Sequence, residues 1–406
     1  MSQPRYIRRL SALERYSLVL DRVYRYHVDA ILEGRGQVNP ALLQSAVDQA
    51  AAANPAIRVR LRGFLAYTKW VDSGISPQVR EMPLSDWDGS SEQHADFLKE
   101  RFDVMRGGAV ADVLIVPCRD GYTRIVFRGL HAAFDGRGCL HWVTEVCRAM
   151  RGETLQGSDS SLTDLDIQAQ YEDQIEPEPP QTPSNCIPVV PPDVDHAQKP
   201  LAYIWRRTVI DNNVSQMLTR TAIFLAEWAR KREEGDVGFT IPIDYRGLRT
   251  NEMSIGNLTG YVRLTVPTDA TSRQLMQQLI GKIRAKADCR QFPGIHKLLW
   301  MPVWLMLRQL MPKVDTILHT VTPALPSGGI VSMGNFVAQD YSFAGFDAHM
   351  LYGIPGAVGK INVVFTNYPN FTTVTFAAPA TYNDHGQLDE LITAFQQHFS
   401  NTGITP

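Results

Sequence analysis

The sequence has no long uninterrupted apolar run. Its most apolar stretch, residues 298–312 ("LLWMPVWLMLRQLMP"), contains Pro302 and Arg308, and it is shorter than the roughly 20 residues that a helix needs to cross a bilayer. We therefore expect no transmembrane segment. We interpret the stretch as a buried or cleft-lining helix; the alternative is a wall for an acyl chain or a contact with a membrane surface.

Cysteine is also scarce. The five cysteines form no CxxC pair, which argues against a structural zinc site and against dithiol chemistry. A sparse, odd-numbered set is typical of the reducing cytosol. The N-terminal residues lack the apolar core and the small-residue cleavage site of a secretory signal. These absences favour a cytoplasmic protein. The cysteines are Cys118, Cys139, Cys147, Cys186 and Cys289.

An excess of positive charge is missing as well. The formal net charge is -2, whereas nucleic-acid-binding proteins usually present a basic face. The ten histidines are dispersed, so no metal cluster is expected. No glycine-rich loop lies between a strand and a helix at the spacing that nucleotide binding requires. We thus expect no nucleic-acid partner, no bound metal and no tightly bound cofactor.

A proline-rich segment divides the chain. Its 406 residues exceed the size of most single cores, so two domains are expected. The stretch "EPEPPQTPSNCIPVVPPDVDHAQKP" holds eight prolines in 25 residues, a composition that excludes a regular helix and predicts an extended connector. We place the connector at residues 156–200, between an N-terminal subdomain, 1–155, and a C-terminal subdomain, 201–406.

Each half mixes strands with helices. Asn39 and Pro40 are good residues to cap and begin a helix at 39–54, and a half-buried strand is expected from Ile57, where apolar residues alternate with arginines. Two strands flank the turn "CRDG". In the second half, the patterns predict helices at 213–235, 271–289 and 385–399 and strands at 201–210, 237–249, 256–267, 328–336, 361–369 and 372–380.

One short stretch suggests chemistry. In "LHAAFDG", His131 and Asp135 lie four residues apart and Gly136 follows, directly after an apolar strand pattern. A loop at the end of a strand can turn an imidazole into a cleft while the aspartate points back into the fold. Histidine suits acid–base work because its ordinary pKa is near 6.5. By spacing alone, an ordinary structural histidine is the alternative.

Several segments, in this order, resemble one superfamily. They are "LSALERYSLV", "NPALLQSAVDQAAAANPAIRVRL", "LHAAFDG", "IPIDYRGLR", "SIGNLTG" and "VSMGNF". The chain is similar to chloramphenicol acetyltransferase, the condensation domains of non-ribosomal peptide synthetases, polyketide-associated acyltransferases and plant BAHD acyltransferases. "LHAAFDG" matches the HHxxxDG motif, with Leu130 at the first histidine. The DFGWG signature of BAHD enzymes is absent, and "DYSFAGF" is at most a distant echo of it.

The resemblance implies an α/β (α+β) fold of two pseudo-symmetric chloramphenicol acetyltransferase-like subdomains with an active-site tunnel between them. It also implies roles for residues. His131 corresponds to the catalytic histidine, and Asp135 to a structural aspartate that pairs with an arginine, for which Arg246 is the first candidate and Arg249 the alternative.

Other residues are candidates for contacts with the reacting groups. The Gly136 backbone N–H, Ser332 and Asn335 could stabilise an oxyanion, and for Ser332 and Asn335 ordinary strand-end hydrogen bonding is the alternative. Ser332, Asn335 and Leu130 are the substrate-binding candidates. Arg137 could meet a phosphate at a tunnel mouth or could be a solvated arginine.

The implied function is that of a stand-alone acyltransferase in natural-product or lipid biosynthesis. It would transfer an acyl group from a thioester, either acyl-CoA or a phosphopantetheine on an acyl or peptidyl carrier protein, to a hydroxyl or amine of a small acceptor. A monomer is expected. The alternatives are a non-catalytic module that recruits carrier proteins or tailoring enzymes, and a condensation-type fold that performs cyclisation, epimerisation or another reaction.

Overall fold

A computed structural model of the chain describes residues 6–23, 25–64, 67–176, 186–191, 203–211, 214–291, 301–306, 308, 326–356, 360–380 and 386–401. The elements of the first half are β1 (Tyr6–Arg9), α1 (Ala12–Val23), β2 (His27–Gly36), α2 (Pro40–Ala53), β3 (Val59–Arg62), β4 (Lys69–Asp72), β5 (Val79–Glu81), β6 (Ala111–Pro117), β7 (Thr123–Leu130), α3 (Gly136–Met150) and α4 (Asp164–Tyr171).

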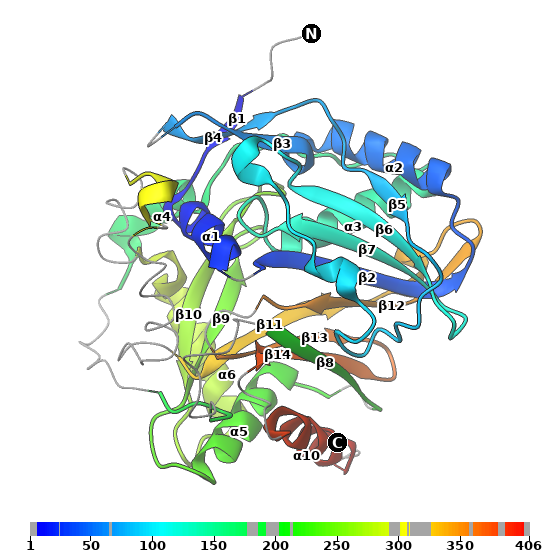
Figure 1. Cartoon of the computed structure of the whole chain (residues 1–406). Helices are drawn as coiled ribbons and strands as arrows, with labels where there is room; N and C mark the ends of the chain where they lie inside the picture. Colours follow the sequence, from blue (N-terminus) through cyan, green and yellow to red (C-terminus); the bar gives the residue numbers. More distant parts are fainter. Residues whose placement is uncertain are drawn as a thin grey trace.

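The elements of the second half follow in Figure 1. They are β8 (Tyr203–Ile210), α5 (Met217–Arg230), β9 (Gly238–Asp244), β10 (Thr259–Thr265), α6 (Ser272–Arg284), β11 (Gly328–Asn335), α9 (Ala338–Tyr341), β12 (Phe346–Ile354), β13 (Ile361–Asn367), β14 (Thr372–Pro379) and α10 (Gln387–Asn401).

Three sheets organise the described part of the chain. The first-half sheet has the strand order β12-β2-β7-β6-β5, and the second-half sheet has the order β10-β9-β11-β13-β14-β8. A small antiparallel sheet, β1-β4-β3, lies above the first of these in Figure 1. Helices α2 and α3 lie on the first-half sheet, and α5, α6 and α10 lie at the far side of the second-half sheet.

Each large sheet is built around its own apolar core. Strand β7 is buried along its whole length, and it packs with α2 and α3 in a core that includes Leu43, Phe127 and Trp142. The core of the second half gathers apolar residues of β9, β13, β14, α5 and α10. These two cores support the proposal of two subdomains. A third apolar cluster joins the halves, because Ile31 and Val126 of the first-half sheet pack with Trp205 and Ala377 of the second-half sheet.

One strand crosses the division that the sequence suggests. Strand β12 belongs to residues 201–406, but it pairs in antiparallel fashion with β2 of the first half, with Phe346 opposite Gly36 and Ile354 opposite Asp29. The sequence patterns did not single out this strand. Its hydrogen-bonding partner lies more than 300 residues earlier in the chain, so no local signal indicates the pairing.

Local predictions were confirmed in part. Helix α2 begins as expected: the Asn39 side chain accepts hydrogen bonds from the N–H groups of Ala41 and Leu42. The strand expected from Ile57 was wrong at its start, because residues Pro55–Arg58 form a 3-10 helix and β3 begins at Val59. A proline at the first position favours a helical turn. The expected alternation also fails, since the arginine that follows Val59 is buried.

The connector region holds structure where it is described. Helix α4 forms within residues 156–200, with a capping box between Thr163 and Asp166. The predicted apolar helix at 298–312 lies mostly outside the described residues. In the described ranges, no helix is both long enough and apolar enough to span a membrane.

Candidate active site

His131 lies directly beyond the end of β7, where the chain turns into α3. Strands β2 and β7 are antiparallel with His27 opposite Leu130, so Tyr26 is the next residue opposite His131. The N–H of His131 donates to the Tyr26 carbonyl at 3.2 Å, which extends this pairing by one step. Residues that face each other in this way place their side chains on the same side of the sheet.

The imidazole is held by an aromatic ring. The rings of Tyr26 and His131 stack with centroids 4.6 Å apart and an interplanar angle of 7°. The carbonyl of His131 accepts a hydrogen bond of 2.9 Å from Nδ2 of Asn257. The His131 side chain is half-buried, and its Nδ1 is the buried nitrogen of the ring. The loop and the stack together fix the orientation of the ring.

Asp135 connects the motif to the second half of the chain. It caps α3, because its carboxylate accepts a hydrogen bond of 2.8 Å from the N–H of Gly138. Its Oδ2 also accepts from the N–H of Leu258 at 2.9 Å and from the hydroxyl of Thr259 at 2.7 Å. An aspartate at this position stabilises the start of a helix, so one side chain closes the motif loop and joins it to β10.

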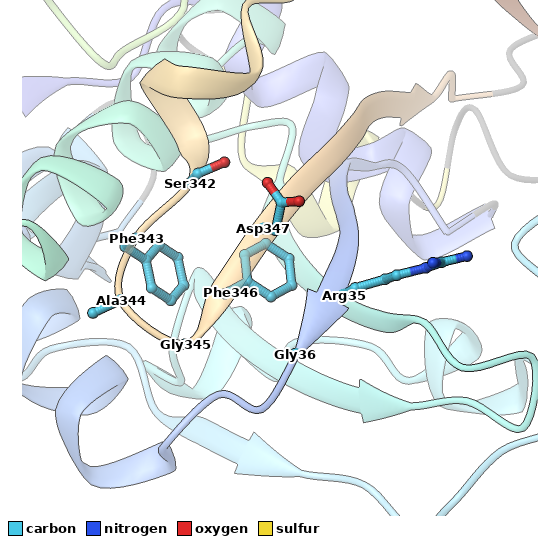
Figure 2. A pocket seen from close by; sticks show the side chains of 8 residues that line it. All are labelled: Arg35, Gly36, Ser342, Phe343, Ala344, Gly345, Phe346 and Asp347. Carbon is cyan, nitrogen blue, oxygen red and sulfur yellow. The ribbon is translucent and has the colours of Figure 1, made fainter.

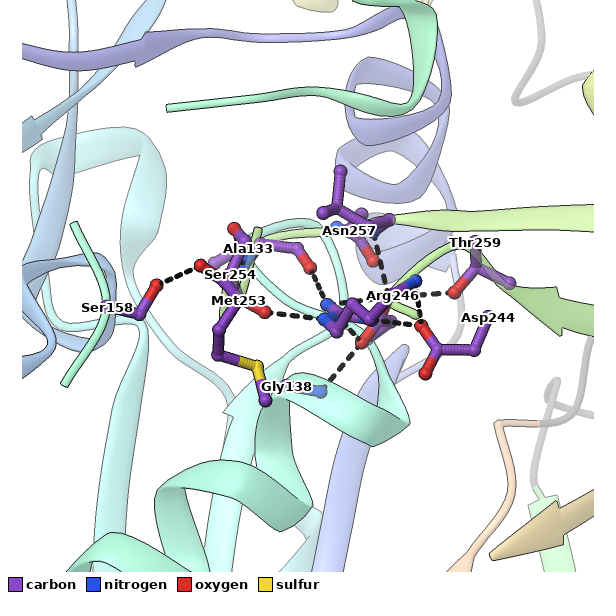
Figure 3. A network of polar contacts seen from close by, with 12 residues as sticks. Ala133, Gly138, Ser158, Asp244, Arg246, Met253, Ser254, Asn257 and Thr259 are labelled. Carbon is purple, nitrogen blue, oxygen red and sulfur yellow. Dashed lines mark hydrogen bonds and ion pairs between the residues drawn. The ribbon is translucent and has the colours of Figure 1, made fainter. Parts of the chain in front are cut away.

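Arg246 completes this connection. Its Nη1 and Nη2 lie 3.1 to 3.2 Å from the Asp135 oxygens, and Nη1 also contacts Asp244 at 2.7 Å. The carbonyls of Ser254 and Gly256 accept from the same guanidinium at 2.7 and 2.6 Å (Figure 3). The candidate partner Arg246 therefore contacts Asp135.

The alternative arginine lies elsewhere. Arg249 forms a buried ion pair with Asp288, with its Nη2 and Nε at 2.6 and 2.9 Å from the carboxylate oxygens. Two arginines three residues apart thus hold two different aspartates. The sequence does not separate them, because their side chains leave the same loop in different directions.

Two glycines of the motif region differ in their surroundings. A Cβ added at Gly138 would lie 2.0 Å from the Ile255 carbonyl oxygen, whereas a Cβ at Gly136 would meet no atom within 4 Å. Gly138 therefore allows α3 to approach the loop before β10. Gly136 borders open space beside the motif, which fits its candidate role of presenting an N–H group to a substrate.

The candidates on β11 are less closely connected to His131. Ser332 Oγ accepts from the N–H of Gly334 at 3.2 Å, and Asn335 Oδ1 accepts from Asn367 at 3.4 Å. Both bonds are of the strand-end kind, and no contact in the described residues joins either side chain to His131. Arg137 is nonetheless near this strand, because it donates to the Met333 carbonyl at 3.1 Å.

Leu130 is placed differently from its prediction. Its side chain is fully buried in the core of the first half, so it offers no surface to a substrate. This packing accounts for an apolar residue at the first position of the motif. Sequence reasoning gave no role to Tyr26, Asn257 or Thr259. The only signal for Asn257 was its place in "SIGNLTG", which served to mark the fold.

A pocket far from the motif is lined by Arg35, Gly36 and residues 342–347 (Figure 2). It lies at the Gly36 end of β2, whereas His131 lies beside the His27 end. At about 3.3 Å per residue, the two ends of this strand are about 30 Å apart. This pocket is therefore separate from the candidate site.

The electrostatics suit proton transfer. Burial lowers the pKa of His131 below its ordinary value, although a hydrogen bond to its own backbone and the nearby Asp135 charge oppose this shift. The ring is therefore neutral near pH 7 and can accept a proton. Burial works against ionisation of Asp135, but Arg246, the Gly138 N–H and the Thr259 hydroxyl hold its pKa below the ordinary value. Asp135 thus stays ionised and keeps its ion pair.

No set of three or more His, Cys, Asp or Glu side chains in the described ranges is arranged to hold a metal ion.

No protein-family model and no curated protein sequence matches the chain. Solved structures do match. The starter condensation domain of the rhizomide synthetase RzmA aligns with 15% identity over 100% of this chain and 98% of that chain, with a TM-score of 0.59. A mutant of that domain in complex with C8-CoA aligns with 14% identity over 100% and 97% of the two chains, with a TM-score of 0.66.

A third match extends the comparison. The first condensation domain of the calcium-dependent antibiotic synthetase, in complex with a substrate analogue, aligns with 14% identity over 98% of this chain and 96% of that chain, with a TM-score of 0.63. The chain is therefore similar to two-lobed condensation-domain structures over its whole length. The predicted α/β (α+β) class and the predicted condensation-domain-like fold are both confirmed, whereas the tunnel between the subdomains stays a prediction.

Proposed function

From a condensation-domain fold with His131 at the junction of its two halves, we propose that the chain is a thioester-dependent acyltransferase. The observation that carries this proposal is the environment of His131: an imidazole stacked on Tyr26, with its pKa lowered by burial, in a loop held by both halves. Both halves of the chain contribute to this environment: Tyr26 of the first half stacks on the ring, and Asn257 of the second half donates to the His131 carbonyl.

The reaction proceeds by direct transfer. Because Nδ1 is buried, Nε2 of His131 accepts the proton of an acceptor hydroxyl or amine as that atom attacks the thioester carbonyl. The tetrahedral intermediate collapses with cleavage of the C–S bond, and the imidazolium returns the proton to the leaving thiolate. The bond to the acceptor forms, the bond to sulfur breaks and a free thiol is released. No covalent acyl-enzyme is required.

The oxyanion needs donors that are oriented before the reaction. The Gly136 N–H is the first candidate, because Gly136 is the first residue of α3 and an added Cβ there would meet no atom within 4 Å. Ser332 and Asn335 remain candidates on β11, which the contact between Arg137 and the Met333 carbonyl brings to the same end of α3. The N-terminal end of a helix also favours negative charge.

The donor is acyl-CoA or the phosphopantetheine thioester of an acyl or peptidyl carrier protein. A structural neighbour bound to C8-CoA supports the first source, and the synthetase context of the neighbours supports the second. Intact-mass measurement of products from a panel of both donor types, each offered with hydroxyl and amine acceptors, would identify the pair that reacts.

His131→Ala tests the catalytic role. We expect thioester turnover to fall about 10²- to 10⁴-fold, because general-base catalysis is typically worth this much. The matched control is His349→Ala, since His349 lies on β12, away from the motif, and pairs with Asp347 at 3.3 Å. Undiminished turnover in His131→Ala, or an equal loss in both variants, would exclude His131 as the base.

A non-catalytic module is the second reading. The feature that favours this reading is Leu130, which stands at the position of the first motif histidine. Since Leu130 is a fully buried core residue, its substitution is explained by packing and does not require the loss of chemistry.

A further inference from the structure

A second buried arginine touches the motif loop from the first half. Arg8 lies in β1 and its side chain is only 2% exposed. Its Nη2 donates to the Ala133 carbonyl, in the middle of the motif, at 2.6 Å. The same nitrogen forms an ion pair with Glu14 of α1. The motif and Arg8 are 125 residues apart in the sequence.

The loop is thus tied at four points. Tyr26 accepts from the N–H of His131 and Asn257 donates to its carbonyl. Arg246 binds Asp135 at the end of the loop, and Arg8 binds the carbonyl between these two ends. Without Arg8, the central carbonyl of the loop would lose its side-chain donor in a buried environment, which is energetically unfavourable.

Glu14 is itself fixed in place. Its Oε2 accepts from the N–H of Ser11 at 3.0 Å, and the N–H of Glu14 donates to the Ser11 hydroxyl at 3.2 Å. This reciprocal pair is a capping box at the start of α1. Because Ser11 fixes both the backbone N–H and the carboxylate of Glu14, this carboxylate keeps the Arg8 guanidinium against the loop.

The second half of the chain also packs closely against Arg8. A Cβ added at Gly256 would lie 3.1 to 3.3 Å from three atoms of the Arg8 guanidinium. Gly256 also provides a carbonyl to Arg246 at 2.6 Å. Two arginines, one from each half, therefore enclose the motif loop together with the backbone around Gly256.

The buried guanidinium is not fully satisfied. Nε of Arg8 is buried and has no hydrogen-bond partner within the described ranges. A buried donor without a partner costs stability, so stability alone does not account well for arginine at this position. The hydrogen bond from Arg8 to the Ala133 carbonyl, at the centre of the motif, offers a different reason for an arginine at this position.

We propose that Arg8 is a positioning residue that sets the orientation of the His131 loop through the Ala133 carbonyl. The inference rests on the proposed acyl transfer at His131. Arg8 does not touch the reacting groups; it acts through the loop. Glu14 supports it by neutralising its charge and fixing its direction.

Two variants of Arg8 test the proposal. Arg8→Met removes the donor and the charge but keeps a long side chain, and Arg8→Lys keeps the charge opposite Glu14 if Arg8→Met does not fold. The matched control is Arg124→Lys, because Arg124 also forms a buried pair with a glutamate, Glu33 at 2.6 Å, and does not contact the motif. His131→Ala is the reference for loss of chemistry.

For the folded Arg8 variants we expect kcat for thioester turnover to fall at least about tenfold, with KM within about twofold of wild type and the Arg124→Lys control near wild type. The acidic limb of the pH–kcat profile should also shift, which a loss of folded protein alone would not produce. Wild-type kcat and pH profile in a folded Arg8 variant, with His131→Ala inactive, would overturn the role of Arg8. Full turnover in His131→Ala would instead overturn the proposed function.

Discussion

Nη2 of Arg246 donates to both oxygens of Asp135, at 3.1 and 3.2 Å, across 111 residues of sequence. The two side chains come from different halves of the chain, and both are largely buried. This ion pair therefore does two things at once. It holds the loop that carries His131, and it connects the first half to the second at the site where the proposed reaction takes place.

Breaking this ion pair should affect both stability and activity. Arg246→Met leaves a buried carboxylate without its main counter-charge, so we expect the free energy of unfolding to fall by about 3 to 5 kcal/mol. Arg249→Met is the control, because it breaks a similar buried pair with Asp288 away from the motif. Denaturant unfolding should show a loss in both variants, and turnover per folded molecule should fall only in Arg246→Met. Equal turnover in the two variants would contradict a specific role for Arg246.

The pH dependence of turnover should report the environment of His131. Burial lowers its pKa below 6.5, so activity should fall only as the pH drops below that value, when the base becomes protonated. Tyr26→Ala uncovers one face of the ring, so the pKa should rise and the acidic limb of the kcat/KM profile should move to higher pH. Tyr26→Phe keeps the stacked ring and should leave the limb in place. Superimposable profiles for Tyr26→Ala and wild type would contradict this account of the stack.

The two motif-region glycines should respond differently to alanine. Gly138→Ala places a Cβ 2.0 Å from the Ile255 carbonyl oxygen, whereas Gly136→Ala places one in open space. Because the contact at Gly138 is with backbone, we expect Gly138→Ala to lose about 1 to 3 kcal/mol of stability. Gly136→Ala should stay within about 0.5 kcal/mol of wild type. Thermal and denaturant unfolding of the two variants make the comparison, and similar losses in both would contradict it.

Asp164 should make stability depend on pH. Burial raises its pKa to about 7, above the value of about 3.9 in an unfolded chain. Between these values the folded state keeps a proton that the unfolded state has lost, so this group's contribution to stability falls as the pH rises from about 4 to 7. This contribution to the free energy of unfolding falls by up to about 4 kcal/mol, because each unit of difference in pKa corresponds to about 1.36 kcal/mol. Asp164→Asn should therefore gain stability relative to wild type across this range; parallel stability curves would contradict the shift.

Several features of this protein follow from the sequence by itself. The helix start at Asn39 and the strands predicted in the second half depend on neighbouring residues, and these predictions agree with the structure apart from a few residues at the strand ends. The family resemblance added Arg246 as the partner of Asp135. Local periodicity could be read because burial on one face of a strand or helix constrains residues two to four positions apart.

The tertiary structure alone decided the rest. It paired β12 with β2, stacked Tyr26 on His131, chose Arg246 over Arg249 and brought Arg8 and Asn257 to the motif loop. Each of these contacts depends on strand register or on the approach of the two halves. Such relationships join residues that are distant in the chain, so no short stretch of sequence records them. They determine how the loop is held, and thereby whether "LHAAFDG" can act as a site.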